Sequence, residues 1–247
     1  MLPGTHSGQA EAVTPRKLVR LALIYEGGLL ILAVLLGWLS GHWPWALWKN
    51  TPQGWLYGTL ATGPLLVVFW ICDRLPVKSL EEIRDFLRTA LAPTLLACST
   101  WQLFLVALLA GGCEELLFRG VLQPWCGIWL SSLIFGLAHA ITPAYAILAG
   151  VISLLLGGLL EWTGDLVAPV VTHTLYDFLA FLWLTTVLRL EQADEAENSG
   201  RELNVAASDR PDDSTADENR SPDENHITDE NPGPDKNLDG DGAAERA

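Results

Sequence analysis

The chain has 247 residues, a formal net charge of −14 and a sequence pI near 4.6, yet half of its residues are hydrophobic. The charge is uneven: residues 1–190 contain 11 Asp and Glu against 10 Lys and Arg, whereas residues 191–247 contain 18 against 5. The acidic pI therefore does not describe the whole chain. The body is nearly neutral and rich in Leu and Trp, which is typical of a membrane protein, and we expect no nucleic-acid partner.

The chain opens with a short cytoplasmic segment, residues 1–17, and a transmembrane hairpin, residues 18–72. A span needs about 20 mostly apolar residues, and such runs occur near 18–39 and 55–72. The first run has no small-residue cleavage site, so we expect an uncleaved span and not a signal peptide. Aromatic residues between the two runs predict a belt at the membrane interface: Trp38, Trp43, Trp45, Trp48, Trp55 and Tyr57.

Residues 73–93 predict an amphipathic helix that lies along the membrane surface. Leu80, Ile83, Leu87 and Leu91 recur at helical spacing between charged residues, and Pro93 ends or kinks the helix. A core of residues 94–190 follows, with apolar runs near 94–123, 128–140, 145–160 and 166–188 and a break at 124–127. The predicted fold is all-α, a multi-pass transmembrane helical bundle of about six spans.

The positive charges next to the predicted spans fall mainly on one side of the membrane. This distribution places both termini in the cytoplasm of a cell, with the protein embedded in the lipid of its inner or plasma membrane. Residues 191–247 are polar and acidic, and we expect a disordered tail. Residues 235–241 resemble the first half of a calcium loop, but the twelfth position is Arg246. A solvated tail is therefore favoured over weak calcium binding.

Three polar motifs interrupt the apolar core, where an ionisable side chain is costly and therefore a functional candidate. They are Glu114-Glu115…Arg119, Phe135…His139 and His173…Asp177. Glu115 and Arg119 are four residues apart, share a helix face and are expected to pair, because an unpaired buried arginine is very costly. This pairing leaves Glu114 free for another role.

Helical geometry predicts one depth for these motifs. Glu114 lies twelve residues before Cys126, in the chain break, and His139 lies thirteen after it. At about 1.5 Å per residue, both are roughly 18–20 Å from the turn of a helical hairpin. His173 and Asp177 are again four apart and face one way. Three helices are thus predicted to direct polar groups into one cavity in the cytoplasmic half of the bundle.

The cluster contains the parts of a hydrolytic site. A carboxylate and an imidazole that hold one water can make it a nucleophile, and a second histidine can donate a hydrogen bond to the developing oxyanion. Glu26, a separate acid in the first span, is expected to serve helix packing or to line a cavity, and we place it outside the site.

The three motifs resemble those of the CPBP family, the intramembrane proteases that include type II CAAX prenyl endopeptidases and bacteriocin-processing enzymes. The family patterns EExxxR, FxxxH and HxxxN, or a close variant, align over roughly residues 95–190. The resemblance implies a helical bundle with a cavity open to the cytoplasm and a glutamate-dependent endopeptidase without an obligatory metal or cofactor. Its substrate is a peptide or protein, prenylated or not. The implied catalytic residues are Glu114, His139, His173 and Asp177, and the implied orienting residues are Glu115 and Arg119.

One residue departs from the family pattern, because position 177 is Asp where Asn is the more familiar residue. An ionised Asp only accepts hydrogen bonds, so it must be protonated or must orient His173. It could also join the histidines and Glu114 as a zinc ligand, which leaves a zinc metalloprotease as an alternative. A non-catalytic membrane scaffold or immunity protein is a second alternative, and a small transporter is a third.

Overall fold

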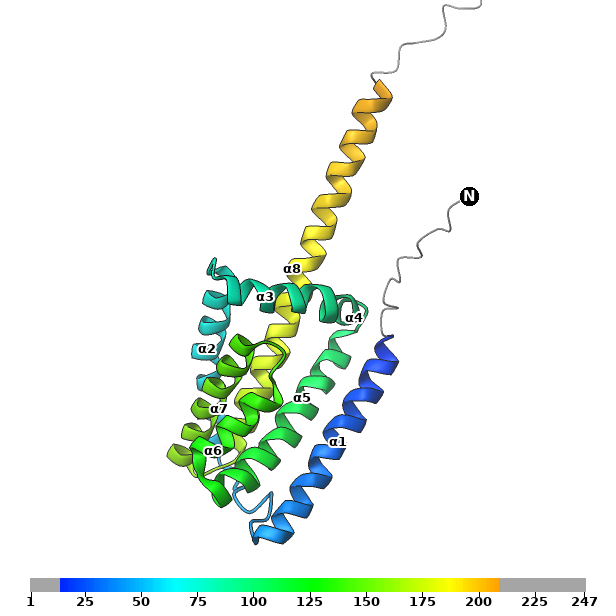
Figure 1. The fold of residues 1–247 in the computed structure, drawn as a ribbon. Coiled ribbons are helices and arrows are strands. Elements are labelled where there is room, and N and C mark those ends of the chain that lie inside the picture. Colours follow the sequence, from blue (N-terminus) through cyan, green and yellow to red (C-terminus); the bar gives the residue numbers. More distant parts are fainter. Residues whose placement is uncertain (1–13, 209–247) are drawn as a thin grey trace, which may run out of the picture. The chain divides into compact units, whose positions relative to one another are not determined.

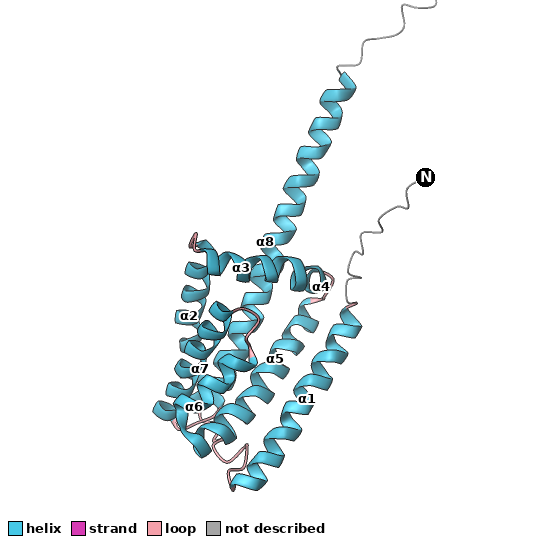
Figure 2. Cartoon of the chain, in the orientation of Figure 1, coloured by secondary structure: helices cyan, strands magenta, loops and turns pink. Residues whose placement is uncertain are grey.

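The computed structural model describes residues 14–208, and every regular element among them is helical (Figures 1 and 2). The predicted all-α fold is confirmed. The elements are α1 Pro15–Ser40, α2 Pro52–Arg74, α3 Lys78–Phe86, the π-helix η1 Leu87–Leu91, α4 Ala92–Leu96, α5 Thr100–Leu117, the π-helix η2 Phe118–Leu122, α6 Gln123–Ala138, α7 Pro143–Thr163 and α8 Val167–Ser208. The chain divides into a unit of residues 1–199, which holds the bundle, and a unit of residues 200–247.

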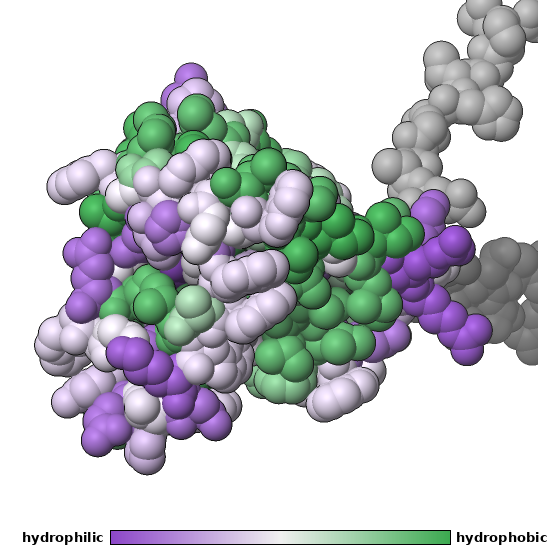
Figure 3. Space-filling view, turned by 90° about the horizontal axis from the view of Figure 1, so that it is seen from below, coloured by the Kyte–Doolittle hydropathy of each residue, from purple (hydrophilic) through white to green (hydrophobic). Residues whose placement is uncertain are grey.

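Four helices among the described residues are long and apolar enough to cross a membrane, namely α1, α2, α7 and α8. The other two predicted spans correspond to α5 with η2 and to α6; α5 by itself has 18 residues and α6 has 16. Large apolar side chains are exposed on the outside of the bundle, such as Ile24, Ile31, Trp129 and Ile147. Figure 3 shows hydrophobic side chains over a broad part of the visible surface. Such a surface requires lipid around it, so the chain is an integral membrane protein.

Three helices begin with the same dipeptide. Thr14, Thr51 and Thr142 each precede a proline and accept a hydrogen bond from the backbone N–H three residues later. The threonine satisfies one of the free N–H groups of the first turn, and the proline has none to satisfy. Gly41 and Gly164 end α1 and α7 with φ of 74° and 62°. These sequence signals therefore fix the helix ends locally.

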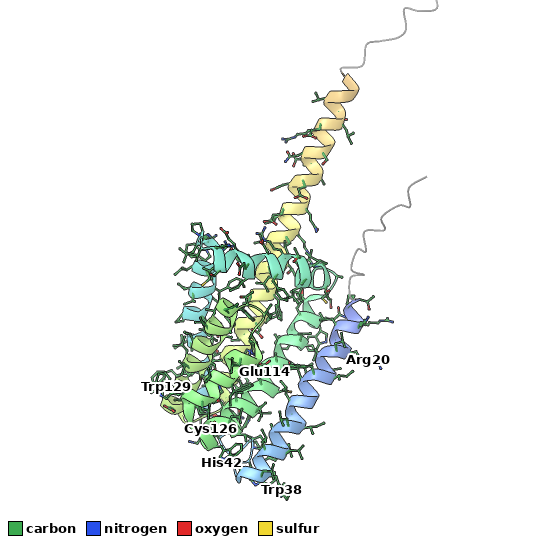
Figure 4. All side chains as sticks on the ribbon, in the orientation of Figure 1. Arg20, Trp38, His42, Glu114, Cys126 and Trp129 are labelled. Carbon is green, nitrogen blue, oxygen red and sulfur yellow. The ribbon has the colours of Figure 1, made fainter. Side chains whose placement is uncertain are left out.

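The two ends of the bundle differ in character. Figure 4 places Arg20 near one end of α1 and Trp38 near the other. The predicted aromatic belt lies at the second end, where Trp43 and Trp45 stack with ring centroids 5.7 Å apart and Trp38 is 67% exposed. At the opposite end α3 lies across the ends of the other helices (Figure 1). This helix buries Ile83 and exposes Lys78, Glu81, Glu82 and Asp85, as its amphipathic sequence predicts, whereas Arg84 is partly buried.

The break predicted near residues 124–127 forms at Gly127, whose φ of 85° separates two helical pieces within α6. Only glycine adopts this left-handed conformation without strain. α5 runs through Gly111 without interruption. A Cβ at Gly111 would lie 2.7 Å from the backbone nitrogen of Thr174. The missing side chain lets α8 approach α5 closely beside the polar cluster.

The boundary of the tail differs from the sequence-based prediction. Residues 191–208 continue α8, whereas the prediction starts a disordered segment at 191. This stretch is rich in Ala and Glu, which favour helix, and it extends a helix that is already nucleated. Residues 209–247, with the calcium-like segment, and residues 1–13 lie outside the described residues.

Asp165 joins two connections that are far apart in sequence. Its side chain is 1% exposed and accepts hydrogen bonds from the backbone N–H groups of Lys49 at 3.1 Å, Thr51 at 2.8 Å and Val167 at 3.1 Å. The Thr51 hydroxyl donates a fourth bond at 2.7 Å. One carboxylate therefore fastens the α1–α2 connection to the start of α8. Burial alone would raise the pKa of Asp165, but these hydrogen bonds lower it below its usual value.

Asp165→Asn is expected to destabilise the protein by about 2–3 kcal/mol at neutral pH, because an amide cannot accept all four bonds. The sign of the pH dependence follows from the lowered pKa: the wild-type advantage is complete above the unfolded pKa and is lost as pH falls through the folded one. Thermal unfolding in detergent micelles between pH 3 and pH 7 measures this difference. The exposed Asp194→Asn is the control, and a difference that does not shrink in acid contradicts the assignment.

Candidate active site

The three motifs meet inside the bundle. Glu114 and Glu115 are at the end of α5, Arg119 is in η2, His139 caps α6, and His173 and Asp177 are in the first turns of α8. Figure 4 labels Glu114 within the bundle, away from both ends. The two glutamates, Arg119 and His173 are each less than 9% exposed. The fold thus collects, at one place, side chains that are up to 63 positions apart in the sequence (Glu114 to Asp177).

The predicted pair between Glu115 and Arg119 forms, with 2.9 Å between Arg119 Nη1 and Glu115 Oε1. Both side chains are almost completely buried, at 0% and 1% exposed. Arg119 Nη2 also donates to the backbone oxygen and the hydroxyl of Ser153 in α7, at 3.0 and 2.9 Å. The guanidinium therefore has hydrogen-bond partners on two helices, which offsets much of the cost of burying its charge.

Glu115 has a second partner that sequence spacing did not predict. Its Oε1 lies 2.8 Å from His173 Nδ1 in α8. The carboxylate oxygen only accepts, so this histidine nitrogen carries the proton. Glu115 thus links Arg119 to His173 and fixes the orientation of the imidazole. The contact joins residues 58 positions apart, and no local sequence signal could reveal it.

Glu114 faces His139, as the depth argument predicts. The distance from His139 Nε2 to Glu114 Oε2 is 3.8 Å, which is too long for a direct hydrogen bond. Glu114 Oε2 is buried without a hydrogen-bond partner. His139 Nδ1 lies 2.9 Å from the backbone oxygen of Phe135 and must donate to it, and the Phe135 and His139 rings stack 4.3 Å apart. In the neutral ring, Nε2 therefore holds a lone pair that faces Glu114.

His173 and Asp177 share one face of α8, as their spacing predicts, with 3.4 Å between His173 Nε2 and Asp177 Oδ2. The whole imidazole of His173 is therefore held between two carboxylates, those of Glu115 and Asp177.

A cavity contains the polar cluster. Its lining includes the four predicted catalytic residues, apolar residues of α2, α6 and α7, and two tyrosines that sequence analysis missed: Glu114, His139, His173, Asp177, Leu65, Phe135, Leu148, Ala149, Ile152, Leu156, Tyr145 and Tyr176. A larger, mostly apolar cavity shares Tyr145, Tyr176 and Asp177 with it and extends to α3 and η1. Tyr145 was missed because it stands outside the three motifs, and Tyr176 because it occupies an unspecified position within the third motif.

Glu26 also belongs to this region, although the sequence-based prediction places it outside the site. It is 6% exposed, and its Oε2 has no hydrogen-bond partner. Its charge interacts with those of His173, Asp177 and Glu114. The face of α1 that carries Glu26 also carries Ala33, which packs against α5 and η2. The predicted packing role does not account for its unpaired oxygen.

The zinc alternative lacks a suitable set of ligands. Among residues 14–208, no group of three or more His, Cys, Asp or Glu side chains is arranged to hold a metal ion. His173 Nδ1 carries the proton that Glu115 accepts, so only its Nε2, which faces Asp177, could offer a lone pair to a metal.

Arg119→Met is expected to lower stability by about 3–5 kcal/mol, because it leaves the buried Glu115 carboxylate without its cation. Thermal unfolding in detergent measures the loss. Arg88→Met is the matched control: it breaks an ion pair with Glu191 whose side chains are 45% and 43% exposed, and such pairs contribute about 1 kcal/mol or less. Equal losses in the two variants would mean that the buried pair does not stabilise the bundle.

Comparison with known proteins places the site within a recognised segment. Residues 96–179 match the family model described as type II CAAX prenyl endopeptidase Rce1-like, and these residues include all three motifs. A protein of Bacillus subtilis, named uncharacterized protein YpbD, is 41% identical over 79 residues, which cover 31% of this chain and 42% of that protein. No solved structure matches the chain. The resemblance seen in the sequence is confirmed over residues 96–179, which match the Rce1-like family of CAAX-type proteases.

Proposed function

We propose that the protein is an intramembrane endopeptidase in which Glu114 and His139 activate water to hydrolyse a peptide bond. The observation that carries this proposal is the Glu114–His139 arrangement: an unpaired buried carboxylate oxygen 3.8 Å from an imidazole nitrogen, both lining a cavity. The two atoms are too far apart to form a hydrogen bond with each other, but one water in the cavity can contact both.

The proposed reaction begins when this water gives a proton to the Glu114–His139 pair and its oxygen adds to the carbonyl carbon of the substrate. The carbonyl oxygen takes up the negative charge of the tetrahedral intermediate. The carbon–nitrogen bond then breaks, and the same proton passes to the leaving amine. Glu115 and Arg119 act at a distance from this chemistry, because they fix the helices and the ring of His173.

Energetics favour this proposal over a purely structural role for the cluster. A scaffold benefits from Glu115, whose Oε1 accepts hydrogen bonds from Arg119 and His173 even though its Oε2 has no partner. It gains nothing from Glu114, whose side chain accepts no hydrogen bond within the described part of the chain, because a buried polar atom without a partner costs stability. Retention of such a group is expected where a substrate or water supplies the missing hydrogen bonds.

The adjoining cavity favours a substrate with an apolar segment. Its volume is about 170 Å³, and most of its lining is apolar. Such a lining suits large apolar side chains or an attached prenyl chain. Arg84 and Arg88 line its outer part. A substrate in this cavity would reach the catalytic groups past Tyr145 and Tyr176.

The distribution of Lys and Arg between the two ends of the bundle suggests on which side of the membrane cleavage occurs. The start of α1, the end of α2 and all of α3 lie at one end (Figure 1), and these segments carry most of the Lys and Arg residues near the bundle. The positive-inside rule assigns this end to the cytoplasm. Cleavage would then occur near the cytoplasmic face, with both termini on that side.

Glu114→Gln and His139→Ala are each expected to reduce kcat at least about 100-fold, because each removes a group that takes the proton of water. Purified protein is assayed on fluorogenic peptides, farnesylated and plain, with and without a strong chelator. Glu82→Gln, on the exposed face of α3, serves as the control and should cleave normally.

Thermal unfolding of the same variants distinguishes the enzyme hypothesis from the scaffold hypothesis. Glu114→Gln should unfold at the wild-type temperature or above it, because it removes an unpaired buried charge. Full cleavage by this variant would overturn the mechanism. Loss of cleavage in chelator, with recovery on added zinc, would establish a metalloprotease instead.

A further inference from the structure

The site lacks an obvious donor for the oxyanion of the tetrahedral intermediate. His139 uses Nδ1–H on the Phe135 carbonyl, and its Nε2 faces Glu114 and takes part in water activation. His173 has Nδ1 on Glu115 and Nε2 facing Asp177. If the His173 ring is neutral, Nε2 has no proton to donate; if it is charged, Asp177 receives that bond. The histidines therefore leave no N–H for the substrate.

The carboxylates do not supply the missing bond either. Ionised Glu114 and Asp177 only accept hydrogen bonds, and their negative charges would repel an oxyanion. Arg119 makes its bonds to Glu115 and Ser153 and is not part of the cavity lining. The remaining polar side chains in the lining are Tyr145 and Tyr176.

Both tyrosine hydroxyls are available as donors. Within the described part of the chain, neither makes a hydrogen bond, and both residues line the cavity of the site and the larger cavity beside it. A phenol keeps its proton at neutral pH and is a strong donor. Charge development on the substrate oxygen is best stabilised by such a preorganised group in a site of low dielectric.

Tyr145 is better placed than Tyr176. Its backbone N–H donates to Thr142 Oγ1 at 3.1 Å in the first turn of α7, which fixes its position. Its ring meets His139 edge-on, with centroids 6.4 Å apart, and the charges of both Asp177 and Glu114 act on it. Tyr176 packs edge-on against Phe69, on the side of the larger cavity.

We propose that the Tyr145 hydroxyl donates the hydrogen bond that stabilises the oxyanion. This inference rests on the proposed peptidase function. In the step concerned, the oxygen of water adds to the carbonyl carbon and the carbonyl electron pair moves to oxygen, which accepts the Tyr145 O–H bond. The proton stays on Tyr145 throughout. When the carbon–nitrogen bond breaks, the carbonyl re-forms, and the proton held by Glu114 and His139 goes to the amine.

The test compares four purified variants on a peptide that the wild type cleaves. Tyr145→Phe removes only the hydroxyl and is expected to lower kcat about 100-fold or more with little change in KM, the effect of removing one oxyanion donor. Tyr176→Phe should have a much smaller effect. The ring of Tyr57 packs on Trp162, near the C-terminal end of α7. The Tyr57→Phe variant should cleave normally.

The fourth variant is Asp177→Asn in the Tyr145→Phe background. The amide at 177 offers an N–H donor at the edge of the same cavity, so kcat should recover part of the loss. A structural role for Tyr145 would give no such recovery and would lower the unfolding temperature. The proposal is overturned if Tyr145→Phe keeps its kcat, or if Tyr176→Phe shows the larger loss. In either case Glu114→Gln would still be inactive, so the peptidase assignment would stand; an active Glu114→Gln would overturn that assignment instead.

Discussion

The buried charge of Arg119 is the constraint on which the catalytic region depends. Its guanidinium is 1% exposed and must find several acceptors, which Glu115 and Ser153 provide from two different helices. Because Glu115 also accepts from His173, one set of hydrogen bonds joins α5, η2, α7 and α8. In lipid, helices gain little from apolar contact with one another, so such polar bonds have a large share in deciding how they pack.

The same constraint separates two adjacent glutamates into different roles. Successive residues of a helix point about 100° apart, so Glu115 faces Arg119 while Glu114 faces the cavity. Oε1 of Glu115 accepts hydrogen bonds from Arg119 and His173, which makes this carboxylate a fixed part of the bundle. Glu114 accepts no such bond, and its Oε2 lies next to an imidazole whose orientation is set by the Phe135 carbonyl. The first supplies the rigidity that the second needs to hold a water in one position.

Several carboxyl groups surround the two histidines of the cavity. Glu114 and Asp177 line it together with the histidines, and Glu26 lies close by. An amide at position 177 would have offered a donor, whereas the carboxylate present binds His173. The donor function then passes to a neutral hydroxyl that lies on another helix, in the first turn of α7. A change at one residue thus alters which of its neighbours can take part in the chemistry.

The sequence by itself determined the helices and much of the site. Apolar length, the Thr-Pro starts and Gly127 fix where helices begin and break, because these are local backbone effects. A spacing of four residues predicted the Glu115–Arg119 pair and the common face of His173 and Asp177. Counting from the hairpin turn brought Glu114 to the level of His139. Only the tertiary structure decided the Glu115–His173 bond, the Asp165 network, the placement of Glu26 and the tyrosines of the cavity. Each of these depends on how helices that are distant in sequence are rotated and packed against one another, and residue spacing within a single helix carries no information about that.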